Sequence, residues 1–288
     1  MTEEKNITTL VADMESISIG GNGWTGNDGS LMGSRIALSS NQRFCYKEKP
    51  RDFLSLSSLG VGCKRKLWYK INQPEQAESM RPSTLLKFFF GDMLEEVALQ
   101  MAKASGHRVE GMQTPLVIEG IKGHRDAVID GVTIDVKSAS PFAFKKFKEG
   151  RLRDDDPFGY ISQLSSYVYA GKDDPLVTEK NKGGFLVIDK VNGNICLDMY
   201  DFSEELENKE QEIRDIKEMV KGDIPKDRIA PVPQSGTSPN TKLSINCSYC
   251  EFKTTCWPEA RKFLYSNGPV YLVDVVNEPK VFEWTDET

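Results

Sequence analysis

The sequence lacks long hydrophobic runs. No apolar run exceeds four residues, whereas a membrane-spanning helix needs about 20, so we expect no membrane span. The first residues, Met1-Thr2-Glu3-Glu4, are acidic where a secretory signal would be basic and then apolar. Both absences predict a cytoplasmic protein.

An excess of positive charge is also missing. The 37 Lys and Arg residues are outnumbered by 43 Asp and Glu, which gives a net charge of −6 and excludes a histone-like polycation. Hydrophobic residues make up 39% and charged residues 28%, values close to the globular norm that exclude a wholly disordered chain. The 288 residues suffice for one large domain or two small ones.

The chain begins with a segment of low periodicity. Six glycines lie between Gly20 and Gly33, and we predict a flexible, Gly-rich arm over residues 1–42. Apolar residues then recur at three- and four-residue intervals from Pro82 to Ser105, which predicts a helix ended by Gly106. The next residue, His107, is expected at the surface.

Strand patterns follow this helix. Segments 114–119, 124–129 and 132–137 are rich in β-branched residues, and Asp130-Gly131 between the last two is a strong hairpin signal. A second helix is predicted over 157–170, a strand pair over 185–189 and 194–199, and a charged amphipathic helix over 203–220. This order predicts a mixed α/β core with helices on both sides of the sheet.

Two acidic residues and a lysine lie on the predicted hairpin. Antiparallel pairing would place Asp126 and Asp135 near one another, at the same end of the hairpin. Because two adjacent carboxylates repel, a positive group or ion is needed between them. Oxygen ligands suit a hard cation such as Mg²⁺ or Mn²⁺. Lys137 shares a strand face with Asp135, so its ammonium would lie beside the metal and could orient a water or offset charge on a phosphate.

Three residues on the flanking helices could complete this arrangement. Glu95 could add a metal ligand from the first helix, although its neighbour Glu96 competes for that role. Gln163 and Tyr167 are four residues apart, so they lie on one helix face and could hold the lysine or a phosphate. Each piece alone is more typical of solvated surface charge, and the hypothesis depends on their combination.

These residues together resemble the PD-(D/E)XK nuclease superfamily and its RecB-type branch. Glu95 matches the acidic helix residue, where many relatives carry His, and Asp126 matches the acid of the second strand. Asp135-Val136-Lys137 matches the acid-x-lysine motif, and Gln163 to Tyr167 the Gln-x-x-x-Tyr motif. The resemblance implies a restriction-endonuclease-like core, a mixed central sheet flanked by helices. It also implies Mg²⁺ or Mn²⁺ held by Glu95, Asp126, Asp135 and the Val136 carbonyl.

A set of cysteines lies outside this core. Cys247, Cys250 and Cys256 fall within ten residues, and a close trio in a reducing compartment indicates a metal centre rather than disulfides. A closed site needs a fourth ligand, for which we favour Cys63, with Cys45 in reserve. Zinc would accept the same four sulfurs. Cys196 is expected in a strand core.

One cysteine before the nuclease core and three after it resemble the iron–sulfur nucleases, namely the CRISPR-associated RecB-like nucleases and the nuclease domain of AddB. That resemblance favours a [4Fe–4S] cluster over zinc, within a helical module that the cluster staples. The predicted segments are a 1–42 arm, the 43–80 and 201–265 parts of the module, an 81–200 nuclease core and a 266–288 acidic tail.

Basic residues offer candidate DNA contacts. Lys64, Arg65 and Lys66 alternate with aromatic residues in a composition suited to single strands, and Lys145 and Lys146 begin a second basic run. An ordinary solvated loop is the alternative for both.

The resemblance implies a metal-dependent exonuclease acting in DNA processing, recombination or CRISPR adaptation. A phage could encode such an enzyme, which would then act in the host cytoplasm. Oligomers are possible. Because no Gly-x-x-x-x-Gly-Lys loop is present, unwinding would need a helicase or another recombination or CRISPR partner. A non-catalytic DNA-binding or assembly subunit, stapled by iron–sulfur or zinc, is the alternative.

Overall fold

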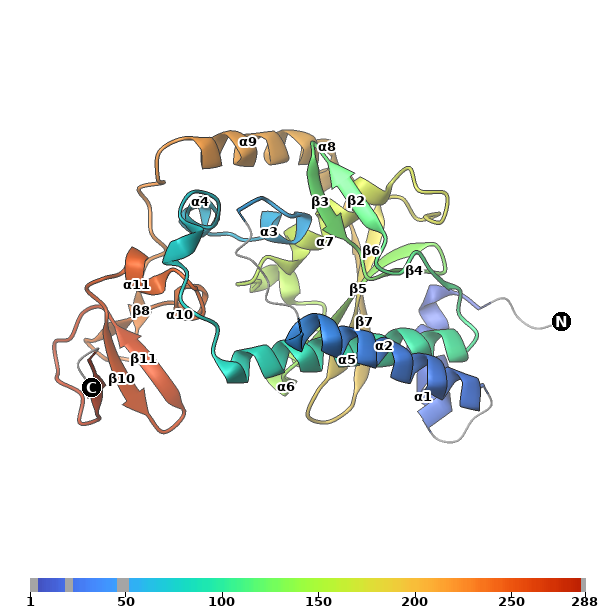
Figure 1. Ribbon diagram of the computed structural model, residues 1–288, viewed down its shortest axis with the longest axis horizontal. Helices are drawn as coiled ribbons and strands as arrows, with labels where there is room; N and C mark the ends of the chain where they lie inside the picture. Colours follow the sequence, from blue (N-terminus) through green and yellow to red (C-terminus); the bar gives the residue numbers. More distant parts are fainter. Residues whose placement is uncertain (1–4, 19–22, 46–51, 286–288) are drawn as a thin grey trace. The chain divides into compact units, whose positions relative to one another are not determined.

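The computed structural model describes residues 5–18, 23–45 and 52–285, and its chain divides into two compact units (Figure 1). The first unit comprises Met1–Lys49, Leu54–Gly60 and Arg81–Ile216, and the second comprises Pro50–Phe53, Val61–Met80 and Lys217–Thr288. Among the described residues, no helix combines the length and apolarity needed to cross a membrane.

A mixed five-stranded sheet forms the centre of the first unit. Its order is β1-β4-β5-β6-β7, with β5 and β6 parallel and the other neighbours antiparallel. Both central strands are buried along most of their length, as expected when both faces of a sheet are covered. The strands are β1 (Val109–Glu110), β4 (Ala127–Ile129), β5 (Val132–Ala139), β6 (Lys182–Asp189) and β7 (Ile195–Asp201).

The predicted hairpin joins β4 to β5. Ile129 pairs with Val132, so only Asp130 and Gly131 lie in the turn. Their φ angles are 48° and 82°, the left-handed backbone at both central positions that a two-residue type I′ turn requires. The Asp-Gly signal is confirmed, and the hairpin fixes the register of the strand that carries the acid-x-lysine motif.

Helices cover both faces of this sheet. On one face, α1 (Leu10–Ser18) and α5 (Pro82–Ala104) contribute to a core with alternate residues of β5 and β6, such as Val136 and Leu186. On the other face, α6 (Pro141–Lys148) and α7 (Tyr160–Gly171) pack against Phe185 and Val187. The predicted mixed α/β architecture is confirmed. Cys196 lies buried in β7 within the second core, as predicted.

The predicted arm over 1–42 is wrong for its described residues, while Gly20, Gly21 and Asn22 lie outside them. Leu10 and Met14 of α1 are fully buried in the core. A 19-residue helix, α2 (Gly26–Phe44), begins at a capping box formed by Thr25 and Asp28. It runs beside α5 (Figure 1) and is held there by Arg43, which makes a bidentate ion pair with Asp92 at 2.8–2.9 Å.

The remaining elements of the first unit are short. The predicted strand 114–119 is half of the β2–β3 hairpin, and the helix predicted over 203–220 is interrupted at Asn208. The N-terminal apolar residues expected in the stripe of α5 are partly exposed, 45% for Leu86 and 43% for Phe90. These elements are η1 (Ile7–Thr9), α3 (Leu56–Leu59), β2 (Pro115–Ile118), β3 (Ile121–His124), η3 (Leu152–Asp154), α8 (Ser203–Glu207) and the start of α9 (Lys209–Lys221).

The second unit combines short helices with a small sheet of order β12-β10-β11-β9-β8. The helices are α4 (Lys64–Asn72), η2 (Pro74–Gln76), α10 (Ile245–Ser248) and α11 (Lys253–Cys256), together with the end of α9. The strands are β8 (Val232–Pro233), β9 (Thr241–Lys242), β10 (Arg261–Tyr265), β11 (Gly268–Leu272) and β12 (Glu283–Trp284).

Three predicted boundaries need correction. Residues 266–285 are not a separate acidic tail, because β11 and β12 pair with β10 and Arg261 binds both Glu278 and Glu283. The first unit, in which the predicted 81–200 core lies, extends to Ile216 rather than residue 200. Residues 54–60, assigned to the cysteine module, belong to the first unit.

His107 is buried rather than exposed at the surface. Its imidazole lies 3.1 Å from Asp13 of α1 and 2.7 Å from Asp130 of the β4–β5 turn. Because side chains from α1 and from the turn bind the same ring, the N-terminal helix is tied to the hairpin.

Candidate functional site

The two strand acids meet because of the hairpin register. Ala127 pairs with Ile134, so the next position on each strand is an acid, Asp126 on one and Asp135 on the other. Asp126 Oδ2 accepts a hydrogen bond of 2.7 Å from the Val136 N–H, which fixes its carboxylate beside β5. Asp135 is only 2% exposed. Two carboxylates are therefore brought together in a poorly solvated place.

A third carboxylate, that of Glu95, approaches from α5. Gln113 Nε2 donates a hydrogen bond of 2.6 Å to Glu95 Oε1, and the carboxylate lies within electrostatic range of Asp135. Its neighbour Glu96 instead forms an ion pair with Arg35 at 3.4 Å. The structure therefore favours Glu95 over Glu96 as the acidic residue that belongs with the strand acids.

Electrostatic repulsion is evident in this acidic cluster, which we define as Glu95, Asp126 and Asp135. Burial, together with the charges of Glu96 and Asp135, raises the pKa of Glu95 to about 7. Burial, Asp135 and Glu95 also raise the pKa of Asp126 well above its usual range. In both cases the negatively charged form is disfavoured, so binding of a cation or a proton stabilises the acidic cluster.

Lys137 compensates part of this charge. Its Nζ lies 2.5 Å from Asp135 Oδ2, and although burial disfavours the ammonium, attraction to Asp135 and Asp126 raises the pKa of Lys137. On α7, Gln163 Nε2 reaches Asp135 Oδ1 at 3.5 Å and Tyr167 Oη at 3.1 Å. The predicted lysine, Gln and Tyr thus surround the carboxylate of Asp135.

The chemistry of these donors fits a hard divalent cation. The donors are carboxylate oxygens, and burial with mutual repulsion leaves them short of positive charge. Within residues 5–18, 23–45 and 52–285, no three His, Cys, Asp or Glu side chains already stand at the separations of a metal-binding group. The roles of Glu95, Asp126, Asp135 and the Val136 carbonyl as metal ligands stay predictions.

We expect the stability of the metal-free protein to fall as pH rises from about 5 to about 8. The folded state holds a proton on Glu95 up to a pKa of about 7, whereas the unfolded chain loses it near the ordinary value of 4.5. Because the folded state binds more protons in this window, the free energy of unfolding decreases with pH. Thermal unfolding in EDTA should show this slope, and Glu95→Gln should flatten it. An unchanged slope in Glu95→Gln would contradict the electrostatic description.

Sequence reasoning missed Gln113. Its backbone N–H donates to the Asp126 carbonyl at 3.1 Å, and its side chain binds Glu95, so one residue connects two of the acids. Its φ is 52°, in the left-handed region that a non-glycine residue seldom occupies. Strained backbone of this kind concentrates at functional sites. No sequence pattern marks this conformation at a glutamine.

The second unit brings together the four-cysteine set, Cys63, Cys247, Cys250 and Cys256. Cys63 caps the start of α4, and the other three lie in or beside the short helices α10 and α11. Cys63 and Cys256 contribute to the electrostatic environment of Cys247, and Cys63 also to that of Cys250. Cys45, the reserve candidate, is exposed at the end of α2 in the other unit. Cys63, unlike Cys45, belongs to the same unit as the other three cysteines.

N–H donors already point at these sulfurs. Arg65 Nε lies 3.3 Å from Cys256 Sγ, and the Phe252 N–H lies 3.4 Å from Cys250 Sγ. The Trp257 side chain packs beside Cys247, and its indole N–H is buried without a hydrogen-bond partner. N–H donors to sulfur stabilise thiolate, the form that binds metals. The four cysteines and their N–H donors therefore have the chemistry expected of a metal centre bound by thiolates.

Without a metal, burial favours the protonated thiols of Cys247 and Cys250. Burial is the main cause that raises the pKa of Cys250 to about 12, and it raises that of Cys247 as well. Metal binding would therefore release protons. The four sulfurs are not at metal-binding separations anywhere in the described part of the chain, so iron–sulfur and zinc both stay predictions.

The basic residues predicted to bind DNA have different surroundings. The Arg65 guanidinium donates to the Pro225 carbonyl at 2.6 Å as well as to Cys256, and Lys66 forms an ion pair with Glu251 at 2.9 Å. Both side chains therefore bind partners within the second unit. Lys64 is exposed at the start of α4, while Lys145 and Lys146 lie on α6 of the first unit.

Comparisons with known proteins add little. No family model matches the chain, and no curated protein matches it. Among solved structures, the chain is similar to the crystal structure of a protein designated SSO0001, with a TM-score of 0.37 and 15% sequence identity. The match covers 78% of this chain and 96% of the other.

Proposed function

We propose that this protein is a metal-dependent deoxyribonuclease, most simply an exonuclease. The observation that carries the proposal is the acidic cluster of Glu95, Asp126 and Asp135, three carboxylates on different elements with the ammonium of Lys137 beside them. The sequence motifs of the RecB-type PD-(D/E)XK nucleases fall on these same residues. The proposal includes a restriction-endonuclease-like arrangement of the core around them.

The proposed roles follow from chemistry. The carboxylates of Glu95, Asp126 and Asp135, with the Val136 carbonyl, would hold Mg²⁺ or Mn²⁺. Such an ion acts as a Lewis acid on a phosphoryl oxygen and makes water more acidic. The ammonium of Lys137 would orient the attacking water and offset charge on the phosphate.

Two residues of α7 would support this lysine. Gln163 and Tyr167 bind one another and approach Asp135 on the side facing α7. Burial, followed by the nearby charge of Asp135, raises the pKa of Tyr167, so its hydroxyl stays protonated and can donate a hydrogen bond. We assign both residues to holding the Asp135 carboxylate and its partner lysine in place.

The four-cysteine set would hold a [4Fe–4S] cluster that stabilises the second unit. The donors from Arg65 and the Phe252 backbone support thiolate ligation, and the family resemblance favours iron–sulfur over zinc. Unwinding would come from a helicase or another partner in recombination or CRISPR adaptation. A cytoplasmic setting, in a phage host if the chain is phage-encoded, would keep the thiols reduced.

The deciding experiment is digestion of end-labelled DNA by anaerobically purified protein. We expect products with Mg²⁺ or Mn²⁺ and none with EDTA, on single-stranded and double-stranded substrates with free or blocked 5′ and 3′ ends. The pattern of blocked ends gives the polarity. Binding without cleavage under every metal condition would favour the alternative, a non-catalytic DNA-binding or assembly subunit.

A further inference from the structure

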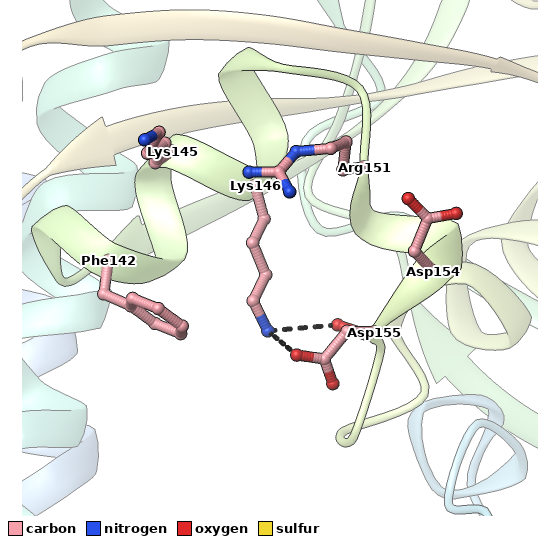
Figure 2. Close-up of a pocket in the computed structure, with 6 residues that line it drawn as sticks. All are labelled: Phe142, Lys145, Lys146, Arg151, Asp154 and Asp155. Carbon is pink, nitrogen blue, oxygen red and sulfur yellow. Dashed lines mark hydrogen bonds and ion pairs between the residues drawn. The ribbon is translucent and has the colours of Figure 1, made fainter.

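A small hollow beside α6 lies outside the acidic cluster. It measures about 290 Å³, at the lower end of the roughly 300–1,000 Å³ typical of small-ligand sites. Figure 2 shows Phe142 on one side, Asp154 on the other, and Lys146 extending between them toward Asp155. Lys145 and Arg151 complete the lining. Its size suits one flat aromatic group rather than a protein segment.

Phe142 of α6 does not pack into the hydrophobic core that this helix covers. Phe144 and Phe147 of α6 are buried, 5% and 3% exposed, against β6 and β7. Phe142 is 76% exposed, and the Lys146 ammonium lies 5.2 Å from its ring centroid. One aromatic side chain is thus presented to solvent next to a cation. An exposed ring flanked by positive charge is a typical platform for nucleobase stacking.

The charges around the hollow are divided between its ends. Lys145 and Arg151 share one carboxylate, that of Glu149, at 3.7 Å and 2.8 Å, so positive charge exceeds negative charge at that rim. Lys146 binds Asp155, and Asp154 lies near it at the other end. A nucleotide matches this division, because its phosphate is negative while the amino groups of its base donate to carboxylates.

The helix α6, which contributes to the hollow, is linked to Lys137 beside the acidic cluster through one ring. The Tyr160 ring centroid lies 4.9 Å from Lys137 Nζ and 6.3 Å from the centroid of Phe147 on α6. Phe142 is also only five residues beyond Lys137 along the chain, so the two Cα atoms are at most about 18 Å apart. A DNA strand at Lys137 would therefore reach Phe142 within a few nucleotides.

We propose that this hollow binds an unpaired base of the DNA strand being cut, stacked on Phe142, with adjacent phosphates on Lys145 and Arg151. The proposal rests on the nuclease function above and specifies its substrate as single-stranded or frayed DNA. A base in a blunt duplex is stacked on its neighbours and cannot occupy the hollow without unpairing. Phe142 should therefore distinguish single strands from duplexes.

Binding to the full-length protein in EDTA tests the proposal independently of cleavage. By fluorescence anisotropy, Phe142→Ala should weaken single-strand binding about 10-fold or more and alter blunt-duplex binding less than about 2-fold, within the scatter of such measurements. Phe142→Trp should retain affinity. Phe282→Ala removes another exposed phenylalanine (55% exposed) and serves as the matched control. Equal losses on both DNAs, no loss, or no DNA binding by the wild type would overturn the proposal.

A fluorescent base tests stacking directly. With 2-aminopurine placed at successive positions from the strand end, one position should be quenched on binding, and Phe142→Ala should abolish that quenching. If a free deoxynucleoside monophosphate competes as well as a strand does, the hollow is a nucleotide site and the strand proposal is wrong. If DNA binding depends on Phe142 but no cleavage is found, the base-binding hollow is supported and the proposed nuclease function is wrong. If Phe142→Ala leaves cleavage unchanged, the nuclease function is supported and the base-binding hollow is wrong.

Discussion

Replacing Asp135 by Asn should reduce metal-dependent DNA cleavage about 1,000-fold or more while the fold is retained. Asp135 is 2% exposed and touches both Lys137 and Gln163. Asn preserves its shape but removes the charge that would bind the ion and hold the lysine. Loss of one such electrostatic element typically costs about 100- to 1,000-fold in rate, and loss of a metal ligand adds to this.

Lys137→Met provides a second variant with a different signature. It should also abolish cleavage, but it leaves Asp135 and Asp126 without the ammonium that balances them, so metal-free protein should be less stable than the wild type. Cleavage is measured on end-labelled DNA and stability by thermal unfolding. Asp173→Asn is the matched control, because it removes an exposed acid outside both the acidic cluster and the hollow beside α6. Full cleavage by Asp135→Asn would refute the assigned site.

Replacing Cys250 by Ser should remove the metal centre and destabilise the second unit. This unit has a small hydrophobic core, in which Cys247, Cys250 and Cys256 themselves pack against Trp257, Tyr69 and Phe252. Metal–thiolate bonding contributes directly to folding free energy. Each kcal/mol lost lowers the melting temperature of a 60- to 100-residue domain by about 4–8 °C, so we expect a decrease of more than about 10 °C.

Metal analysis and absorption spectra of anaerobically purified protein measure the same loss. The wild type should be brown and carry iron, and Cys250→Ser should be colourless. Cys45→Ser is the matched control, because Cys45 is exposed in the first unit. A colourless wild type with bound zinc would show that the centre is zinc rather than iron–sulfur, while its proposed role in stabilising the second unit would remain. A metal-free wild type of undiminished stability would exclude both.

The hairpin and its acids could be predicted because local rules determine them. An Asp-Gly turn needs two residues with positive φ and sets the register, and the register then places Asp126 beside Asp135. The alternation of side chains puts Lys137 next to Asp135. These features lie within the twelve residues from Asp126 to Lys137, so local rules suffice to predict them.

Other features depend on contacts that a sequence does not display. The helix α2 contains Gly29 and Gly33, which disfavour helix formation, and it is stabilised by Arg43 and Arg35 pairing with acids of α5. Its Thr25-x-x-Asp28 capping box was the one local signal available. Gln113 could not be predicted, since its left-handed backbone follows from its contacts with Glu95 and Asp126.

The buried imidazole of His107 has a practical consequence. Every recognised motif lies beyond residue 60, which suggests trimming the chain to that portion. Such a fragment would lose Asp13, one of the two carboxylates that grip the ring, and would strip Leu10 and Met14 from the interior. The other carboxylate, that of Asp130, lies in the turn that leads into β5, the strand that carries Asp135. A shortened fragment that is to fold must therefore keep the amino-terminal helix α1.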